Sequence, residues 1–272
     1  MSELRRHGEM GFPTCPGTGC RGSATMNYSV EMRTAIVTVL SLLAAPAHCQ
    51  AKPSSLLDRA MKAAGGESRL KEFRGLEWNG PGVVHIPNRD IAIRGTWRIQ
   101  PPDSAVVTTY DTLRGPATAR SLIVAGPRGW IRRDTTFTPL PDDILAEEQH
   151  QYYLYSLLRL VPLREKGVKL HAVFPDSAGH AGFRVERRGR LPVTMFFDSA
   201  GAVARMVTQF ALPGPVPGDA QVVNLYGSTT SNGVRWFRRM EITRAGKPYF
   251  DLEIDSLTMK RSIEVPLLAG PS

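Results

Sequence analysis

The stretch IAIRGTWRI, residues 91–99, alternates apolar or small side chains with mostly polar ones at a period of two. One face carries the apolar and small residues: Ile91, Ile93, Gly95, Trp97 and Ile99. The other face carries two arginines, Arg94 and Arg98. This alternation is typical of an antiparallel strand that presents one face to a core and the other to water.

Two stretches near the C-terminal end repeat this pattern. In VRWFRRMEI, residues 234–242, one face is apolar apart from Arg238, and FDLEID, residues 250–255, alternates in the same way. Weaker strand signals occur around residues 75–86, 104–113, 118–124, 129–134, 168–174, 182–187, 193–198, 202–210 and 221–227. Short turns join most of these segments, which predicts one large antiparallel sheet and a mainly β (α+β) fold.

Two of the predicted turns share the tetrapeptide DSAG, at residues 176–179 and 198–201. Aspartate favours the start of a turn and glycine accepts a positive φ, so both read as hairpin connections. Neither serine lies in a G-x-S-x-G motif, and turn chemistry accounts for all four residues of each tetrapeptide.

Two helices are predicted beside this sheet. The first follows Ser54 or Ser55 as its N-cap and ends at Gly65-Gly66. The second spans about residues 141–161, with Pro141 in its first turn and Pro162 at its end. Its apolar residues follow the spacing i, i+3, i+4, i+7, which predicts a buried stripe: Leu154, Leu157, Leu158 and Val161, extended backward to His150 and Glu147.

Residues 32–51, MRTAIVTVLSLLAAPAHCQA, have the three parts of a secretory signal: a positive start, an apolar run and an A-x-A site. The apolar run of 11 residues is far shorter than the roughly 20 residues that cross a bilayer, so no transmembrane helix is expected. We therefore expect residues 1–51 to be an N-terminal extension plus signal peptide, and residues 52–272 to form a single exported domain. Met32 or Met26 is the expected initiator, and an extended signal is the alternative.

All three cysteines, Cys15, Cys20 and Cys49, precede the expected domain. Lipid attachment usually requires a small residue before the cysteine, but His48 precedes Cys49, so a lipid anchor is disfavoured. A C-x4-C pair without a second pair is a poor zinc site. Together with the export signal, a domain that folds without disulfides favours a periplasmic or other bacterial envelope protein over a small extracellular domain held by disulfides.

Residues 52–272 carry 30 Lys and Arg against 22 Asp and Glu, a net charge of +8. A basic balance is compatible with nucleic acid, anionic lipid headgroups or an acidic protein partner. The charges alternate with apolar residues and the chain carries an export signal, so no nucleic-acid partner is expected. A solvated outer face explains most of the charge, and docking of an envelope protein stays an alternative.

The sequence offers no motif for catalysis, metal binding or a cofactor. The histidines after residue 51 lack metal-ligand spacing, and neither a phosphate-binding glycine loop nor a dinucleotide fingerprint is present: His85, His150, His171 and His180. The neighbouring carboxylates Asp142-Asp143 and Glu147-Glu148 point to different sides of the predicted helix, which disfavours an acid–base pair. We therefore predict no catalytic residue, no metal and no cofactor.

The segments FFDSAGAVARMVTQF, residues 196–210, and DAQVVNLYGSTTSNGVRWFRRMEITRAGKPYFDLEIDSL, residues 219–257, resemble the C-terminal half of lipoprotein carriers of the LolA/LolB-like superfamily. The residues that match its hairpin and turn pattern are Phe197, Asp198, Gly201, Arg205, Gly233 and Gly246. AAGGESRLKEFRGLEWNG, residues 63–80, resembles the helix-then-strand start of exported relatives. The resemblance implies an incomplete antiparallel barrel over one or two helices, with an apolar cavity for acyl chains and no catalytic residues.

The leading functional hypothesis is an exported, non-enzymatic carrier or sensor for a lipid, a lipoprotein acyl chain or another hydrophobic molecule. A cavity is expected between the apolar face of the sheet and the 141–161 helix, with these wall residues: Trp97, Tyr153, Leu157, Phe197 and Trp236, and His150 at the rim. In the alternative, the same residues fill a dry core and the basic outer face docks a protein partner. A hydrolase with an unrecognised site is the third reading.

Overall fold

The computed structural model describes residues 52–210 and 220–265. The predicted signal at 32–51 and all three cysteines lie outside these residues, as does residue 219, the start of one matched segment. Within the described part, no helix combines the length and the apolar character that crossing a bilayer requires.

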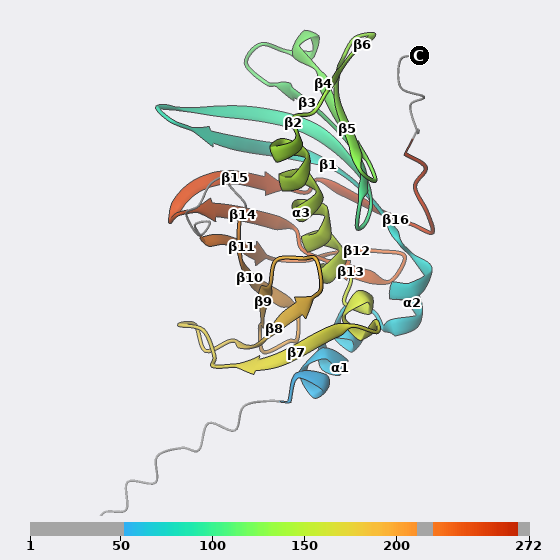
Figure 1. Cartoon of the computed structure of the whole chain (residues 1–272), viewed down its shortest axis with the longest axis vertical. Helices are drawn as coiled ribbons and strands as arrows, with labels where there is room; N and C mark the ends of the chain where they lie inside the picture. The colour runs from blue at the N-terminus through green and yellow to red at the C-terminus, as the bar shows by residue number, and fades with distance from the viewer. Residues whose placement is uncertain (1–51, 211–219, 266–272) are drawn as a thin grey trace, which may run out of the picture. The chain divides into compact units, whose positions relative to one another are not determined.

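Among the described residues, fourteen strands form one antiparallel sheet, which bends around the helices without closing into a barrel (Figure 1). In spatial order its strands are β6 (Thr136–Pro139), β5 (Arg128–Arg133), β4 (Arg120–Ala125), β3 (Ser104–Asp111), β2 (Arg89–Gln100), β1 (Gly75–Ile86), β15 (Lys247–Glu253), β14 (Arg239–Arg244), β11 (Ala220–Tyr226), β10 (Val203–Gln209), β9 (Val193–Phe197), β8 (Ala181–Arg187) and β7 (Val168–Val173), with β16 (Ser256–Lys260) paired to β1. This architecture confirms the predicted mainly β fold, a large antiparallel sheet curled into an incomplete barrel over helices.

The alternation at residues 91–99 has the predicted effect on β2. Gly95, Trp97 and Ile99 are buried, whereas Arg94 is exposed on the other face. Ile93 is only half-buried, because it lies toward the outer end of the long β1–β2 hairpin. The inner face of β2 therefore contributes to the core at one end and remains accessible at the other.

Strand β1 changes its partner at Gly80. Residues 75–79 pair with β16, and residues 82–84 pair with β15. A Cβ atom at Gly80 would lie 1.9 Å from the carbonyl oxygen of Glu253, so only glycine fits where the two partner strands meet.

The prediction of one continuous strand at 234–242 is wrong. Val234–Trp236 forms β13, which pairs with β12 (Thr229–Ser231) in a separate two-stranded sheet, and the main sheet resumes at β14. Between them the Arg238 amide donates to the carbonyl of Tyr226, and the Arg238 carbonyl accepts from the amide of Ile254. The single arginine that interrupts the apolar face thus marks the break.

The first helix has a different start from the predicted one. Helix α1 (Pro53–Ala63) begins with Pro53 in its first turn, Lys52 is its N-cap residue, and Ser55 Oγ donates to the Lys52 carbonyl at 2.9 Å. Gly65 and Gly66 both have positive φ, as predicted for its end, and a short helix α2 (Glu67–Glu72) follows. Both DSAG tetrapeptides are hairpin turns, as predicted, joining β7 to β8 and β9 to β10.

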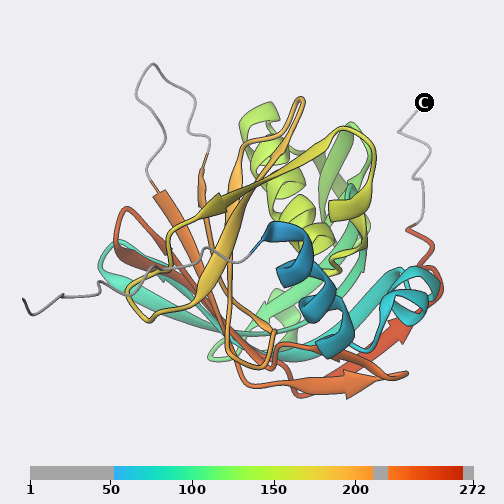
Figure 2. The same ribbon diagram turned by 90° about the horizontal axis from the view of Figure 1, so that it is seen from below.

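Helix α3 (Asp142–Leu158) is shorter than the predicted 141–161 helix. Pro141 is its N-cap residue rather than part of the first turn, and a 3₁₀ helix, η2 (Val161–Arg164), follows its end. Every residue from Tyr152 to Leu158 is buried, because the bent sheet and α1 surround this end (Figure 2). Leu154, Leu157 and Leu158 of the predicted stripe are buried as expected. Glu147 and His150 are only half-buried, and Val161 lies beyond the helix and is half-buried as well.

A single core connects the sheet and the helices. Trp97, Leu157, Trp236 and Leu252 all belong to it, whereas Ile93 is half-buried and packs against it. At its centre the Trp78 ring stacks on Trp97 with centroids 6.3 Å apart and meets the edge of Tyr155 at 5.4 Å.

Candidate functional site

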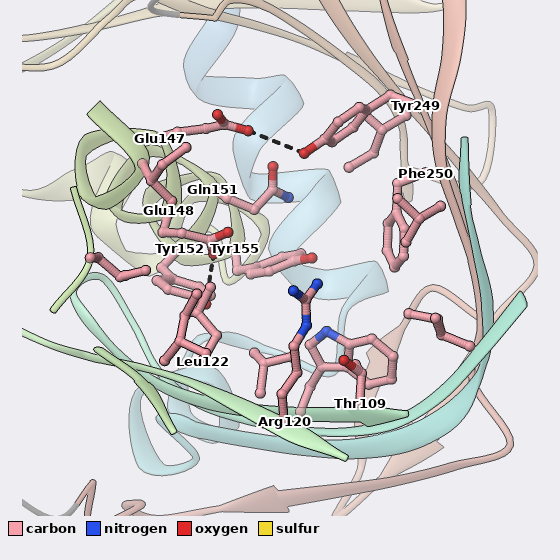
Figure 3. Close-up of a pocket in the computed structure, with 18 of the residues that line it drawn as sticks. Thr109, Arg120, Leu122, Glu147, Glu148, Gln151, Tyr152, Tyr155, Tyr249 and Phe250 are labelled. Carbon is pink, nitrogen blue, oxygen red and sulfur yellow. Dashed lines mark hydrogen bonds between the residues drawn. The ribbon is translucent and has the colours of Figure 1, made fainter. Parts of the chain in front are cut away.

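A cavity of about 320 Å³ lies between the inner face of the sheet and helix α3 (Figure 3). Its lining residues come from β1 to β5, from β14 and β15, from α3 and from the segment just before α3: Val84, Ile93, Trp97, Val107, Thr109, Arg120, Leu122, Ile131, Leu140, Ile144, Glu147, Glu148, Gln151, Tyr152, Tyr155, Ile242, Arg244, Tyr249 and Phe250. The volume is at the lower end of the range of about 300–1,000 Å³ for small-molecule sites.

The period-two pattern of the strands supplies the apolar wall. On β3, Val107 faces the cavity while its neighbour Val106 packs on the opposite side of the sheet. On β2, Gly95 lies between the wall residues Ile93 and Trp97, and a Cβ atom there would be only 3.0 Å from the Trp97 ring. The absence of a side chain at Gly95 therefore leaves room for the tryptophan.

A bulge between β14 and β15 brings two consecutive residues to the cavity. The register passes from Ile242 opposite Phe250 to Thr243 opposite Pro248, so Tyr249 has no partner across the ladder. A bulge can re-aim a side chain without ending the strand. Tyr249 and Phe250 consequently both line the cavity.

Helix α3 faces the cavity with a stripe different from the apolar one predicted from the sequence. The lining residues follow i, i+3, i+4, i+7, i+8, i+11, and they mix polar and aromatic side chains: Ile144, Glu147, Glu148, Gln151, Tyr152 and Tyr155. The helix is enclosed on several sides. Its leucine residues pack into the core, and the face with polar and aromatic residues borders the cavity.

Arg244 holds together the part of the cavity formed by β14, β15 and α3. Its guanidinium is 2.5 Å from the Glu147 carboxylate, and its Nε donates to Gln221 Oε1 at 2.8 Å. The same guanidinium lies over the Tyr249 ring, 3.5 Å from the centroid, and the Tyr249 hydroxyl donates to Glu147 at 3.2 Å. The charge of Arg244 is thus balanced by Glu147 within the protein.

The side chain of Glu148 is a weaker acid than that of an ordinary glutamate. Burial among protein atoms raises its pKa to about 7, and the negative charge of Glu147 acts in the same direction. The Tyr152 hydroxyl donates to its carboxylate at 2.9 Å and opposes the rise, as do Arg244 and Arg120. Because the carboxyl group borders the cavity, Glu148 keeps some accessible surface despite these surroundings.

Arg120 extends from the start of β4 into the cavity, toward the side chains of α3 (Figure 3). Within residues 52–210 and 220–265, no carboxylate oxygen lies within 4.0 Å of its guanidinium nitrogens. Gln151 also borders the cavity, and its buried Nε2 makes no hydrogen bond in this part of the chain. The cavity is therefore lined by one exposed cation without an ion pair, whereas the Gln151 amide nitrogen is enclosed by protein atoms beside the Tyr155 hydroxyl.

Of the residues that the sequence predicts as cavity walls, Trp97 lines the 320 Å³ cavity. Leu157 and Phe197 are enclosed in the core, and Tyr153 is buried beneath Arg190, whose guanidinium lies 5.0 Å from the ring centroid. Trp236 borders a separate, smaller cavity of about 50 Å³ near α1.

His150, the predicted rim residue, lies outside the lining of the large cavity. Its Nε2 is 3.2 Å from Thr208 Oγ1. Burial lowers the pKa of His150 to about 4, and the positive charges of Arg190 and Arg244 add to this effect. The imidazole is therefore neutral in the folded protein at neutral pH.

Three residues that line the cavity were not predicted as site residues: Arg120, Glu148 and Tyr249. Arg120 and Tyr249 lie in strands whose facing depends on register and on a bulge, and no local pattern encodes these. The cavity-facing residues of α3 do recur at helical spacing in the sequence. A search for apolar residues at that spacing finds the leucines of another face instead. In the described part of the chain, no group of three or more His, Cys, Asp or Glu side chains could hold a metal ion.

No family model and no curated protein matches this sequence. Among solved structures, the fold is similar to a LolA superfamily protein from Nitrosomonas europaea, with 10% identity over 79% of this chain and 96% of that chain and a TM-score of 0.50. It is also similar to a putative outer membrane lipoprotein-sorting protein domain from Vibrio parahaemolyticus, with 8% identity over 78% and 95% of the chains and a TM-score of 0.50. The chain therefore has the LolA-like fold that its sequence partly resembles.

Proposed function

We propose that this protein is an exported, non-enzymatic carrier or sensor that shelters an apolar molecule, such as a lipid or a lipoprotein acyl chain, in the cavity beneath α3. The observation that carries this proposal is the cavity of about 320 Å³, with an apolar wall on the sheet and polar groups beside the helix. Ligand sites in proteins commonly combine mostly apolar walls with a few placed polar groups.

The size of the cavity sets the size of the molecule that it can hold. An engineered apolar cavity of about 150 Å³ accepts a benzene molecule, so a cavity of roughly twice that volume offers room for about twelve carbon atoms. Each methylene taken from water contributes about 0.8 kcal/mol, which gives on the order of 10 kcal/mol before the costs of association are subtracted. Against an association cost of about 4–15 kcal/mol, a single alkyl chain can therefore supply most of the binding free energy.

Two further observations support the envelope setting. Residues 32–51 have the composition of a secretory signal. One protein of similar fold is described as a putative outer membrane lipoprotein-sorting protein domain. Both agree with a carrier that works outside the cytoplasm.

Filling the cavity should abolish binding while the fold survives. We expect an uncharged, environment-sensitive alkyl probe to bind the wild type saturably, and Val107→Phe to weaken this binding at least tenfold, about 1.4 kcal/mol. Val107 faces the cavity from the middle of β3, so the added ring occupies the space of the ligand. Fluorescence titration measures the affinity, and thermal unfolding confirms that the variant is folded.

Val106→Phe is the matched control, because Val106 precedes Val107 on the same strand and packs on the opposite face. It should bind the probe as the wild type does. Mass spectrometry of an organic extract of the gently purified protein should also find a stoichiometric apolar molecule. Absence of saturable binding together with a clean extract would instead favour an interaction module with a basic docking face.

A further inference from the structure

The charged groups of the cavity do not balance one another. Arg244 is paired with Glu147, with nitrogen and oxygen 2.5 Å apart. Glu148 is about half protonated at pH 7 and mostly protonated at pH 6, because burial raises its pKa to about 7. Arg120 is exposed and has no ion pair among the described residues, so at pH 6, where Glu148 is mostly protonated, the groups that line the cavity carry a net charge close to +1.

We propose that Arg120 anchors the carboxylate headgroup of a single-chain amphiphile of medium length, whose alkyl tail lies against the apolar wall of β2 to β5. This inference rests on the proposed function and assigns the headgroup chemistry of the same site. Guanidinium presents two parallel N–H groups that match the two oxygens of a carboxylate. The single uncompensated charge matches a monoanion rather than a headgroup that carries two or more negative charges.

The neighbours of Arg120 add donors for the same headgroup. Gln151 has an enclosed Nε2 beside the Tyr155 hydroxyl, without a well-formed hydrogen bond among the described residues. Glu148, when protonated, has one O–H to donate, and the Tyr152 hydroxyl already occupies the other side of its carboxyl group. Figure 3 shows Arg120 and Gln151 approaching the same space from β4 and from α3. A carboxylate placed there would satisfy groups that are otherwise left without partners.

The length of the ligand follows from the volume. A cavity of about 320 Å³ has room for about twelve carbons, which is one medium chain and not two long ones. The apolar wall residues Trp97, Leu122 and Ile131 lie on β2, β4 and β5, the sheet side from which Arg120 also extends. The tail and the headgroup can therefore be held at the same time.

Decanoate, decan-1-ol and decylamine should compete with the uncharged probe at pH 6 to different extents. They share one chain length and differ in headgroup charge. An apolar cavity without a free cation would prefer the alcohol, because burial of an unpaired carboxylate is unfavourable. With Arg120 as the anchor, decanoate should bind about fivefold more tightly than decan-1-ol, because solvent screens a charged pair at the exposed Arg120.

Arg120→Gln should remove the preference for decanoate and leave the affinity for decan-1-ol within about twofold of the wild type. The matched control is Arg133→Gln on β5, which removes one exposed positive charge outside the lining and should keep the preference. Equal binding of acid and alcohol by the wild type, a preference that survives in Arg120→Gln, or tighter binding of decylamine would overturn the headgroup assignment. If neither the probe nor any competitor binds, the carrier function itself fails.

Discussion

Replacing Leu157 by Ala should lower the free energy of unfolding by about 2–5 kcal/mol, the range for deletion of an enclosed leucine side chain. Leu157 is 1% exposed and belongs to the central core, at the end of α3 where every side chain is buried. The tightly enclosed helix end has little freedom to collapse onto the space that is left. Urea unfolding followed by circular dichroism measures the change.

Leu113→Ala is the control for this experiment, because Leu113 is 93% exposed and its truncation should change stability by less than about 0.5 kcal/mol. Leu157 does not line the large cavity, so the Leu157→Ala variant should bind the alkyl probe normally wherever it is folded. If it instead loses probe affinity while its stability is unchanged, Leu157 is a ligand contact, as the sequence pattern predicted.

The strands could be predicted because their signal is local. Residues 91–99 alternate so regularly that the buried face of β2 follows from sequence alone, and each DSAG turn is specified by its own four residues. The same reasoning failed at 234–242, where an apolar face continues across two sheets. Strand breaks of this kind depend on hydrogen bonds to distant segments, here the bonds of Arg238 to Tyr226 and Ile254.

The location of the cavity could be predicted from the sequence, but the polar groups that line it could not. The apolar alternation of the strands predicts which face of the sheet points toward α3. Trp97 lies on that face and therefore lines the cavity. The position of Arg120 depends on the register of β4 against β3, where it lies opposite Thr109. The raised pKa of Glu148 depends on burial in the folded protein and on the neighbouring charge of Glu147. Both are properties of the assembled sheet, so no short sequence pattern contains them.

Glu148 and His150 should make the stability of the protein depend on pH in opposite directions. The pKa of Glu148 rises from 4.5 to about 7 on folding, so the folded protein keeps a proton that the unfolded chain loses, and stability falls as pH rises through this interval. The pKa of His150 falls from 6.5 to about 4 on folding. As the pH decreases through this interval, the unfolded chain therefore binds a proton that the folded protein does not bind. Its contribution to stability is therefore lost as pH falls from about 6.5 to about 4.

Each of these shifts corresponds to about 3 kcal/mol at about 1.4 kcal/mol per pH unit. Between about pH 4.5 and 6.5 the two slopes have opposite signs and similar size, so they should nearly cancel in the wild type. Glu148→Gln leaves only the histidine effect, and the stability of this variant should rise by up to about 3 kcal/mol, relative to the wild type, between pH 4.5 and 7. His150→Gln should show the reverse, with relative stability rising as pH falls from 6.5 to 4.

Urea midpoints at pH 4.5, 5.5, 6.5 and 7.5 measure both trends, and comparison with the wild type removes the contribution of every other titrating group. The double variant Glu148→Gln, His150→Gln is the control and should match the wild-type pH profile between about pH 4.5 and 6.5 to within about 1 kcal/mol. A Glu148→Gln variant whose profile parallels the wild type would show that Glu148 ionises normally in the folded protein. In that case the carboxylate would be free to pair with Arg120, and the positive charge that the cavity offers to a ligand would be neutralised from within.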